Sequence, residues 1–352
     1  MTHNWLSFLD KRESHYVRNI FIDFSKAFDS VEPALLCSKL LSYDYPPWFV
    51  GFVFHFLSRR IQYVRLGTEI SAPCYTSRGL PQGTILGPSL FSIMINDLNP
   101  IDDLNVKVVR YADDQTVSVF VRKDFPDSSQ FELDNISSWC ANNDMFLNAT
   151  RTKEMIICFS KFPCNPPSLS VGDAVIERVQ NWKCLGVTFS SNMSWTYHFD
   201  SIITKGQSLI YLIRCIITSN DLLRPDLDFL VNSLLVPVLC YASPCWSNST
   251  KWDQARLASL HKSAYRIMQR ISPSRSLYEI IQDINWNFFR DCLNADHPLH
   301  SLIPSRTERA SRNRGSIIPV PRANTERLRR HFLIASINLI MLAFLAKYPY
   351  IN

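Results

Sequence analysis

The sequence lacks the features that mark several common classes of protein. Its ten cysteines are scattered and include no Cys-x-x-Cys pair, so a disulfide scaffold is not indicated and we expect reduced thiols. Residues 1–19 are too polar for a signal peptide. The most apolar run, residues 332–346, is shorter than the roughly 20 residues that a membrane-spanning helix needs. Internal repeats and low-complexity tracts are also absent. We therefore expect an intracellular protein with no membrane partner.

Excess positive charge is missing from most of the chain and is concentrated in one segment. The 352 residues carry a formal net charge of +6. Residues 301–330 hold eight arginines and two glutamates, and eight minus two accounts for the whole +6. This pattern indicates a polyanionic partner, with a solvated surface segment as the alternative. The arginines expected to bind nucleic-acid phosphates are Arg306, Arg309, Arg312 and Arg314.

Strand and helix patterns between residues 20 and 160 predict an α+β domain, because helices mixed with an antiparallel sheet form such layers. The expected elements, in order, are a strand at 20–22, helices from Pro33 and Pro47, a hairpin that turns near Gly67, a helix from Ser89, a hairpin over 106–121, a helix over 131–148 and a strand over 154–160. Beyond a Pro-rich break at 161–173, a short hairpin is followed by apolar stripes at helical spacing. These stripes predict a helical region.

Two adjacent acids occupy the expected tip of the 106–121 hairpin. Asp113 and Asp114 stand between valine-rich stretches, where like charges repel and lose hydration. A divalent cation converts this repulsion into coordination, and Mg²⁺ prefers carboxylate and phosphate oxygens. Asp23, which closes the first strand, is the expected third ligand of a two-metal site for phosphoryl transfer. On spacing alone, the competing acids are Asp29, Asp102 and Asp103.

Several motifs occur in the order found in reverse transcriptases. "FIDFSKAFDSV" (21–31), "GLPQGTILGPSLFSIMINDL" (79–98) and "YADD" (111–114) resemble those of non-LTR (LINE-like) retrotransposon enzymes near the CR1 and jockey types. "FLNATRTKEMIICFS" (146–160) and "WKCLGVTFSSNMSWTYHF" (182–199) are similar to the next two motifs of that family. The resemblance is strong over roughly residues 18–200 and weaker beyond. It implies a polymerase palm followed by a helical, thumb-like region.

The resemblance implies roles for individual residues at the metal and nucleotide sites. Asp23 and Asp113 would hold two Mg²⁺ or Mn²⁺ ions, and Asp114 would complete the triad. Phe28 matches the aromatic residue beneath the incoming sugar, where a ring clashes with a 2′-hydroxyl and selects deoxynucleotides; core packing is the alternative. The remaining nucleotide-binding candidates are Gln82 and Gly83 beside the template base and Arg78 near phosphate or template.

The resemblance also implies a primer-binding hairpin and a general acid. Leu185 and Gly186 would form the hairpin that holds the primer end, with a plain structural turn as the alternative. Where the family has a lysine that protonates pyrophosphate, this chain has Arg151, whose pKa is too high for that role. Lys153, two residues further on, is the alternative acid. The chain is expected to lack most of the family's fingers subdomain and an upstream endonuclease.

Four regions are expected from the breaks and the resemblance together. They are a palm at 1–160, a linker and primer-binding hairpin at 161–200, a thumb-like region at 201–300, and an Arg-rich segment with an apolar terminal helix at 301–352. The expected partners are an RNA template, a DNA primer or target and deoxynucleoside triphosphates. We expect a ribonucleoprotein of nucleus and cytoplasm.

Three other functions compete with a reverse transcriptase. A non-catalytic remnant would only bind nucleic acid, and the missing fingers favour it. Phe28 disfavours a polymerase that synthesises RNA. The motif at 182–199 favours the retrotransposon type over a group II intron maturase.

Overall fold

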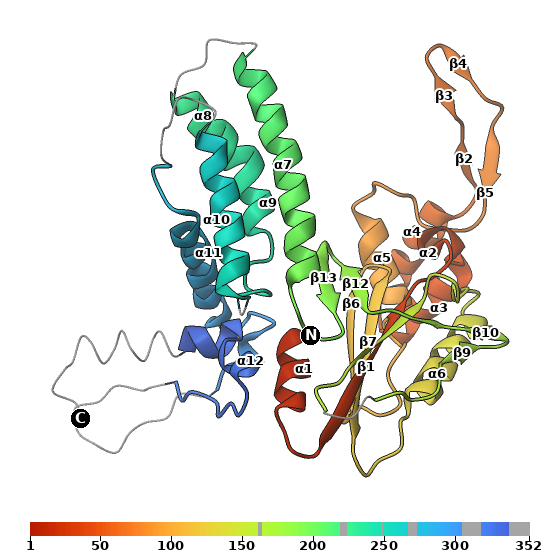
Figure 1. The fold of residues 1–352 in the computed structure, drawn as a ribbon. Coiled ribbons are helices and arrows are strands. Elements are labelled where there is room, and N and C mark those ends of the chain that lie inside the picture. Colours follow the sequence, from red (N-terminus) through yellow and green to blue (C-terminus); the bar gives the residue numbers. More distant parts are fainter. Residues whose placement is uncertain (161–163, 219–223, 248, 267–272, 305–317, 338–352) are drawn as a thin grey trace, which may run out of the picture. The chain divides into compact units, whose positions relative to one another are not determined.

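The computed structural model describes the chain except for residues 161–163, 219–223, 248, 267–272, 305–317 and 338–352 (Figure 1). Its internal contacts divide the chain into two compact units. One unit is Glu13–Gln180, and the other joins Met1–Arg12 to Asn181–Asn352.

The Glu13–Gln180 unit is built on a five-stranded sheet with the order β11-β8-β1-β7-β6. The strands are β1 (Ser14–Ile22), β6 (Val106–Tyr111), β7 (Asp114–Arg122), β8 (Lys153–Ile157) and β11 (Glu177–Arg178). All neighbours are antiparallel except β11 and β8, which run parallel. Strand β1 lies at the centre of the sheet, between β8 and β7, and its last seven residues are buried. Because successive side chains of a strand point to opposite faces, this burial means that both faces of β1 are covered.

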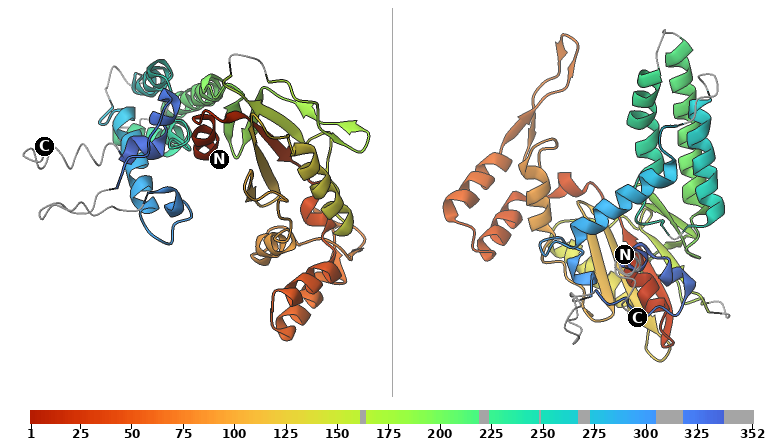
Figure 2. Two further views of the ribbon diagram at one scale, coloured as in Figure 1. Left: turned by 90° about the horizontal axis from the view of Figure 1, so that it is seen from below. Right: turned by 90° about the vertical axis from the view of Figure 1, so that its left-hand side faces the viewer.

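Helices pack on one face of this sheet (Figures 1 and 2). They are α2 (Ala27–Ser30), α3 (Pro33–Ser42), α4 (Pro47–Leu57), α5 (Leu86–Met94) and α6 (Ser129–Asn142). Ile20 and Ile22 of β1 share a hydrophobic core with Leu36, Phe91 and Leu133 from these helices. Ile20 and Ile22 reach the same core because they are two residues apart, and alternate side chains of a strand share a face. The expected α+β class, a sheet flanked by helices, is confirmed.

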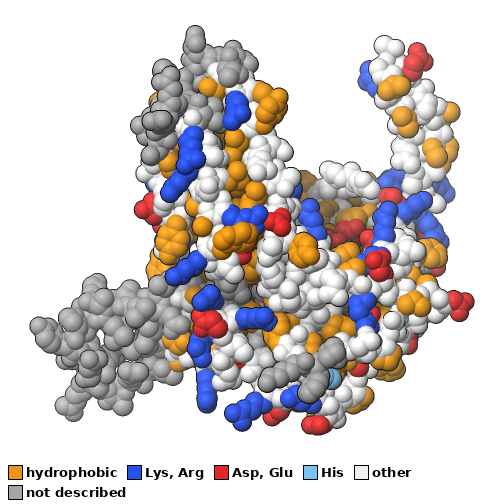
Figure 3. Space-filling view, viewed as in Figure 1, with side chains coloured by type: hydrophobic (Ala, Val, Ile, Leu, Met, Phe, Trp, Pro, Cys, Tyr) orange, Lys and Arg blue, Asp and Glu red, His pale blue; other side chains and the backbone are white. Residues whose placement is uncertain are grey.

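A hairpin between α4 and α5 turns at Gly67, as the sequence predicts (Figure 1). Its base pairs β2 (Arg60–Gln62) with β5 (Cys74–Thr76), and its tip pairs β3 (Arg65–Leu66) with β4 (Glu69–Ile70). Residues 61–75 of this hairpin are exposed, and Leu66 at its tip is 82% exposed. Apolar side chains are visible along the surface of the hairpin (Figure 3). A shorter pair, β9 (Ser170–Val171) and β10 (Ala174–Val175), lies beside α6.

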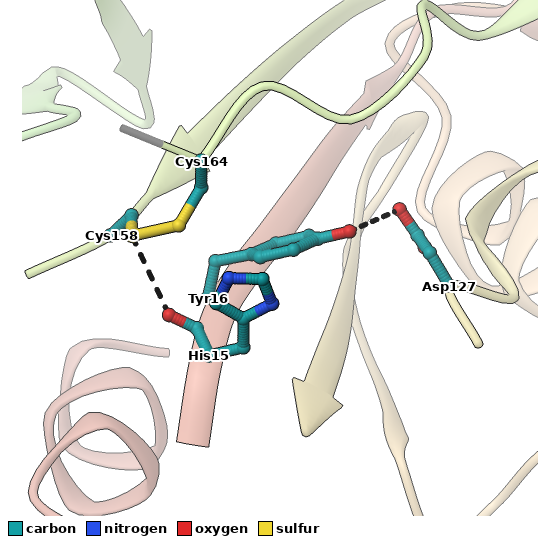
Figure 4. The surroundings of a disulfide bond; sticks show 5 residues. All are labelled: His15, Tyr16, Asp127, Cys158 and Cys164. Atoms are coloured by element: carbon teal, nitrogen blue, oxygen red, sulfur yellow. Dashed lines mark hydrogen bonds between the residues drawn. A yellow bond between two sulfur atoms is a disulfide. The ribbon is translucent and has the colours of Figure 1, made fainter. Parts of the chain in front are cut away.

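A buried ion network crosses the sheet from the middle of β1. Arg18 contacts the carboxylates of Glu154 and Asp127, and Arg178 binds the second oxygen of Glu154 at 2.8 Å. Glu154 is completely buried and Arg18 is 2% exposed. Tyr16 adds a 2.8 Å hydrogen bond to Asp127 (Figure 4). Because each of these charges is paired, the network is tolerated inside the unit.

Cysteine pairing differs from the sequence-based expectation at one place. Cys158, just beyond β8, forms a disulfide with Cys164 (Figure 4). The expectation of reduced thiols is therefore wrong for this pair. The two cysteines are six residues apart, a separation that a search for Cys-x-x-Cys pairs does not find.

The second unit contains one hairpin and a set of helices. Its elements are α1 (Thr2–Leu9), β12 (Asn181–Cys184), β13 (Val187–Ser190), α7 (Thr196–Thr218), α8 (Arg224–Leu230), a π-helical turn (Val231–Leu235), α9 (Val236–Cys240), α10 (Lys251–Tyr265), α11 (Leu277–Cys292), a 3₁₀ turn (His300–Leu302) and α12 (Glu326–Arg329). The expected helical region begins with α7, and a π-helical turn separates α8 from α9, because Pro237 has no backbone N–H and its ring crowds the preceding turn.

The N-terminal helix and the end of the described chain belong to the same unit. Asp10 accepts backbone hydrogen bonds from Asn324 and Thr325, at 2.7 and 2.6 Å. Residues 332–337 are helical, and Phe332 and Ile337 are buried against Phe289 of α11. Arg306, Arg309, Arg312 and Arg314 lie outside the described residues, as does the rest of the apolar run. Among the described helices, none combines the length and apolar character required to cross a membrane.

Candidate active site

Three aspartates meet at one edge of the five-stranded sheet. Strands β1 and β7 pair Ile22 with Gln115, so the next position outward on this register places Asp23 opposite Asp114. Strands β6 and β7 pair Tyr111 with Asp114, which leaves Ala112 and Asp113 as the turn. Opposite residues of antiparallel strands present their side chains on the same face. The fold therefore brings Asp23, Asp113 and Asp114 together.

The tightness of this turn is what holds Asp113 at the sheet edge. Ala112 has φ of 50°, in the left-handed region that suits two-residue hairpin turns. The turn is exposed at Asp113 and half-buried at Ala112. Strand β7 then begins at Asp114 and is buried from Gln115 to Val121. Asp113 and Asp114 thus lie at the start of a strand whose following residues are buried.

Among the described residues, no Lys, Arg or His side chain forms an ion pair with Asp23, Asp113 or Asp114. Burial raises the pKa of Asp114, and the neighbouring carboxylates of Asp113 and, to a smaller extent, Asp23 raise this pKa further. The Oδ2 atom of Asp23 is buried and has no hydrogen-bond partner. Three oxygen-donor carboxylates with an orphaned buried oxygen are a donor set that suits a hard divalent cation. Within the described part of the chain, no three or more His, Cys, Asp or Glu side chains are arranged as a ready metal-binding group.

The backbone of Asp23 is fixed by the segment that follows α6. Its N–H lies 3.3 Å from the Thr152 hydroxyl, and its carbonyl accepts a 2.8 Å hydrogen bond from Asn148. An isolated bridge between Phe24 and Leu147 continues this contact. The sequence did not single out Thr152 or Leu147 for this role, because Thr152 contacts Asp23 and Leu147 pairs with Phe24 from more than 120 residues away in the chain.

The two candidate general acids differ in their surroundings. Lys153 pairs with Phe21 of β1, two residues before Asp23, so it shares the face of the sheet that carries the acids. Its ammonium group forms a 2.7 Å ion pair with Glu177. Arg151 is exposed, and its guanidinium has no partner among the residues that the structure describes. The structure thus gives Lys153 a fixed position and leaves the Arg151 side chain free.

The Gly-rich loop of residues 79–83 lies against α2. Gly79 has φ of 83°, and a Cβ there would come within 2.8 Å of the Asp29 backbone, so only glycine fits. Gln82 is exposed, and its Nε2 lies 3.4 Å from the Asp29 carboxylate. Gly83 has φ of 79° and open space around it. Asp29 of α2 therefore contacts this loop through its backbone and its carboxylate.

Phe28 contributes to packing while it remains half-buried. Its ring stacks on Phe91 of α5, with centroids 4.5 Å apart and an interplanar angle of 21°. The partly buried Phe28 side chain packs against the hydrophobic core of the Glu13–Gln180 unit. This geometry is compatible both with core packing and with a ring face that a ligand reaches.

Arg78 and Asp102 both have partners that fix them. Arg78 is about half-exposed and forms ion pairs with Glu32 at 2.8 Å and Asp144 at 3.1 Å, so it ties the loop to two neighbouring segments. Asp102 accepts hydrogen bonds from Asn105, which lower its pKa. It precedes the start of β6, whereas the three acids lie beyond its end. The fold therefore separates Asp102 and Asp103 from the three-acid group.

Leu185 and Gly186 form the two-residue turn between β12 and β13, in the other unit. Tyr241 donates a 2.8 Å hydrogen bond to the carbonyl of Leu185. The sequence did not indicate Tyr241, because this contact joins residues 56 positions apart. Only the tertiary structure shows it.

These features define a polymerase palm. They are a largely antiparallel sheet with helices on one face, aspartates at the tip of the β6–β7 hairpin, and a loop at 79–83 that requires glycine. The chain belongs to the family "Reverse transcriptase (RNA-dependent DNA polymerase)", whose model matches residues 4–189.

Curated relatives specify the branch of the family. The chain is 26% identical over 264 residues to the RNA-directed DNA polymerase from mobile element jockey of Drosophila melanogaster, covering 71% of this chain and 28% of the relative. It is 23% identical over 352 residues to the probable RNA-directed DNA polymerase from transposon BS of the same organism, covering 97% of this chain and 36% of the relative. The resemblance to non-LTR retrotransposon enzymes is thereby confirmed. The chain spans about a third of these relatives' lengths.

A solved structure of telomerase from Candida tropicalis, in complex with a fragment of telomeric RNA, is also similar to this chain. The identity is 10% and the TM-score is 0.42, with 99% of this chain and 50% of that chain covered.

Proposed function

We propose that this chain carries the catalytic core of an RNA-directed DNA polymerase of a non-LTR retrotransposon. The core would add deoxynucleotides to the 3′-hydroxyl of a DNA primer on an RNA template. The observation that carries this proposal is the uncompensated acid group, in which the Asp23 Oδ2 atom lacks a partner and the pKa of Asp114 is raised. Family membership supports the reaction class.

The three acids would hold two divalent ions, Mg²⁺ or Mn²⁺. When bound, such ions polarise the phosphoryl group and neutralise charge as it develops on the oxygens. Asp23 and Asp113 would bind both ions, and Asp114 would complete the set. The protein's contribution would be to fix the carboxylates at the end of β1 and the start of β7, since the register of these strands sets their spacing before any ligand arrives.

Neighbouring residues would bind and select the nucleotide. Phe28 would present its ring beneath the sugar and exclude a 2′-hydroxyl by steric contact, with Phe91 supporting that ring. Gln82 and Gly83 would line the nucleotide and template base, since glycine lets the backbone approach closely. Arg78 would contact phosphate or template through the half of its side chain that remains exposed.

A cation near the acids would assist the departure of pyrophosphate. Lys153 is the better proton donor because an ammonium group loses its proton more readily than a guanidinium group. Its ion pair with Glu177 would have to open for this role. The Arg151 guanidinium has no partner in the described part of the chain and would supply electrostatic stabilisation without transferring a proton.

The wider organisation follows from the same proposal. The Glu13–Gln180 unit would act as the palm, the β12–β13 hairpin would bind the primer end, and the helices after it would act as a thumb. The template would be RNA, the primer or target would be DNA, and the protein would function within a ribonucleoprotein in nucleus and cytoplasm.

The basic segment would bind nucleic-acid phosphates through Arg306, Arg309, Arg312 and Arg314. Each neutralised phosphate contributes about −0.7 to the slope of log affinity against log salt for single strands. Replacing all four arginines with glutamine should therefore make this slope shallower by about 3. An unaltered slope would assign the segment to solvated surface.

Primer extension on an RNA template tests the catalytic proposal. We expect that Asp23→Asn abolishes deoxynucleotide addition, because one ligand oxygen of the acid group loses its charge. Asp103→Asn is the matched control, since it removes an exposed carboxylate outside the group. Equal activity of wild-type protein and Asp23→Asn would overturn the assignment. A wild-type chain that binds primer–template but shows no extension would favour the non-catalytic alternative.

A further inference from the structure

The tip of the β12–β13 hairpin adopts a backbone conformation that its own sequence only partly supports. Cys184 pairs with Val187, so Leu185 and Gly186 form a two-residue turn with φ of 47° and 81°. Two positive φ values define a type I′ turn, which matches the twist of the paired strands. Leucine is unfavourable in this region because its Cβ crowds the following carbonyl. An interaction from outside the hairpin therefore helps to fix the tip.

Tyr241 supplies that interaction in two ways. Its hydroxyl donates a 2.8 Å hydrogen bond to the carbonyl oxygen of Leu185. Its ring covers Gly186 so closely that a Cβ on this glycine would lie 3.0 Å from the Cε1 atom of Tyr241. Both the φ value and the ring exclude a side chain at position 186. The tip is thus held from its carbonyl and from one face.

Tyr241 is itself anchored in the helical part of the unit. It follows the last residue of α9, and its carbonyl accepts a 2.9 Å hydrogen bond from the indole of Trp246. Trp246 is 1% exposed and packs against Phe199 of α7. In the same turn, Ser243 donates a 2.6 Å hydrogen bond to Asn285 of α11. A chain of contacts therefore runs from the hairpin tip through Tyr241 to buried side chains.

The exposure of Tyr241 indicates that core packing is not its main contribution. The residue is 52% exposed, although both its hydroxyl and its carbonyl are hydrogen-bonded. A half-exposed residue whose hydroxyl and backbone carbonyl are both hydrogen-bonded contributes more to positioning than to the burial of apolar surface. What it positions is the backbone of Leu185 and Gly186.

We propose that Tyr241 is a positioning residue that locks the Leu185–Gly186 turn in the geometry needed to bind the 3′ end of a primer. This inference rests on the proposed function, which assigns primer binding to the β12–β13 hairpin. Ligand contacts made by a backbone turn need that turn to be held in place, because small displacements weaken them strongly. Loss of one hydrogen bond of this kind corresponds to about a fivefold change in affinity.

The test compares two labelled ligands by fluorescence anisotropy with the full chain. One is a DNA primer annealed to an RNA template with a recessed 3′ end, and the other is the same duplex closed at both ends, so that no 3′ end exists. We expect wild-type protein to prefer the recessed end. Tyr241→Phe, which keeps the ring, should reduce this preference about fivefold without weakening binding of the closed duplex. Gly186→Ala should reduce it at least as much.

The matched control is Tyr211→Phe, which removes a hydroxyl from a 68% exposed tyrosine of α7 and should leave the preference unchanged. Retention of the full preference by Tyr241→Phe and Gly186→Ala would overturn the inference while leaving primer binding by the protein intact. An equal loss of affinity for both ligands would also overturn it, because that result indicates a general structural role. If wild-type protein shows no preference, primer binding by this hairpin fails as well, whereas the Asp23→Asn extension assay still reports on catalysis independently. If Gly186→Ala does not fold, the Tyr241→Phe result decides alone.

Discussion

Replacing Asp113 with asparagine should not destabilise the protein in the absence of a divalent cation. When a divalent cation is added, the variant should become less stable than wild type. In chelator, the variant removes one of two neighbouring carboxylates that raise the pKa of Asp114. Two unit charges about 5 Å apart repel by roughly 1 kcal/mol at the dielectric constant of water. Asp113 and Asp114 are both exposed, so this water-like limit applies. We therefore expect the variant to be as stable as wild type or more stable, by at most about 1 kcal/mol.

In Mn²⁺ wild type should be more stable than Asp113→Asn, because Asp113 then acts as a ligand of the cation. Binding to the folded state alone stabilises by about 2.7 kcal/mol when the free cation is at 100 times its Kd. For a unit of this size, each kcal/mol corresponds to about 2–4 °C in Tm. Wild type should gain about 5–10 °C on this basis, and Asp113→Asn should gain much less.

The pH dependence gives a second check on the same residues. A raised pKa means that folded protein holds the Asp114 proton more tightly than unfolded protein. Stability in chelator should therefore fall as pH rises from the ordinary pKa of a carboxyl group through the raised pKa of Asp114. This fall should be smaller in Asp113→Asn, because one cause of the raised pKa is gone.

The assay is thermal unfolding followed by circular dichroism, in chelator and in Mn²⁺, with Asp103→Asn as the control. Equal Mn²⁺-dependent gains in wild type and Asp113→Asn would refute the reasoning. So would a marked destabilisation of Asp113→Asn in chelator, since it would show that the Asp113 carboxylate has a favourable partner in the protein itself.

Three further predictions concern other parts of the chain. Phe28→Val should raise ribonucleotide incorporation relative to deoxynucleotide, chiefly through a lower ribonucleotide KM in primer extension; unchanged sugar selectivity would assign Phe28 to packing alone. Glu154→Gln should destabilise the protein by about 3–5 kcal/mol in urea unfolding, because it leaves Arg18 and Arg178 without their shared buried carboxylate, and a loss below about 1 kcal/mol would contradict this account. Burial, with Lys205 and Lys183 adding to it, lowers the pKa of His198 to about 4. Unfolded protein then binds more protons than folded protein between about pH 6.5 and 4, so stability should fall as pH decreases through this window, by up to about 3 kcal/mol from this residue. His198→Gln should lose part of that dependence, and an identical pH profile for wild type and variant would exclude the contribution.

Local patterns in the sequence were sufficient for several features. Valine-rich alternation around residues 111–114 predicted the hairpin and the position of two acids at its tip, because a strand's period and a turn's composition are both local. The Pro33 and Pro47 helix starts and the Gly67 turn followed from the same kind of signal. The order of the motifs also indicated the family, which the comparisons confirmed.

Tertiary structure decided which distant residues meet. Spacing left Asp29 and Asp102 as rivals of Asp23, and the β1–β7 register resolved this by setting Asp23 opposite Asp114. The same holds for the ion pair of Lys153 with Glu177 and for the Cys158–Cys164 disulfide. Strand pairing joins positions that are far apart in the chain, such as Ile22 and Gln115, and no local periodicity encodes the partner or the register. For that reason the sequence identified the acids of the site, whereas the fold determined which of them share one edge of a sheet.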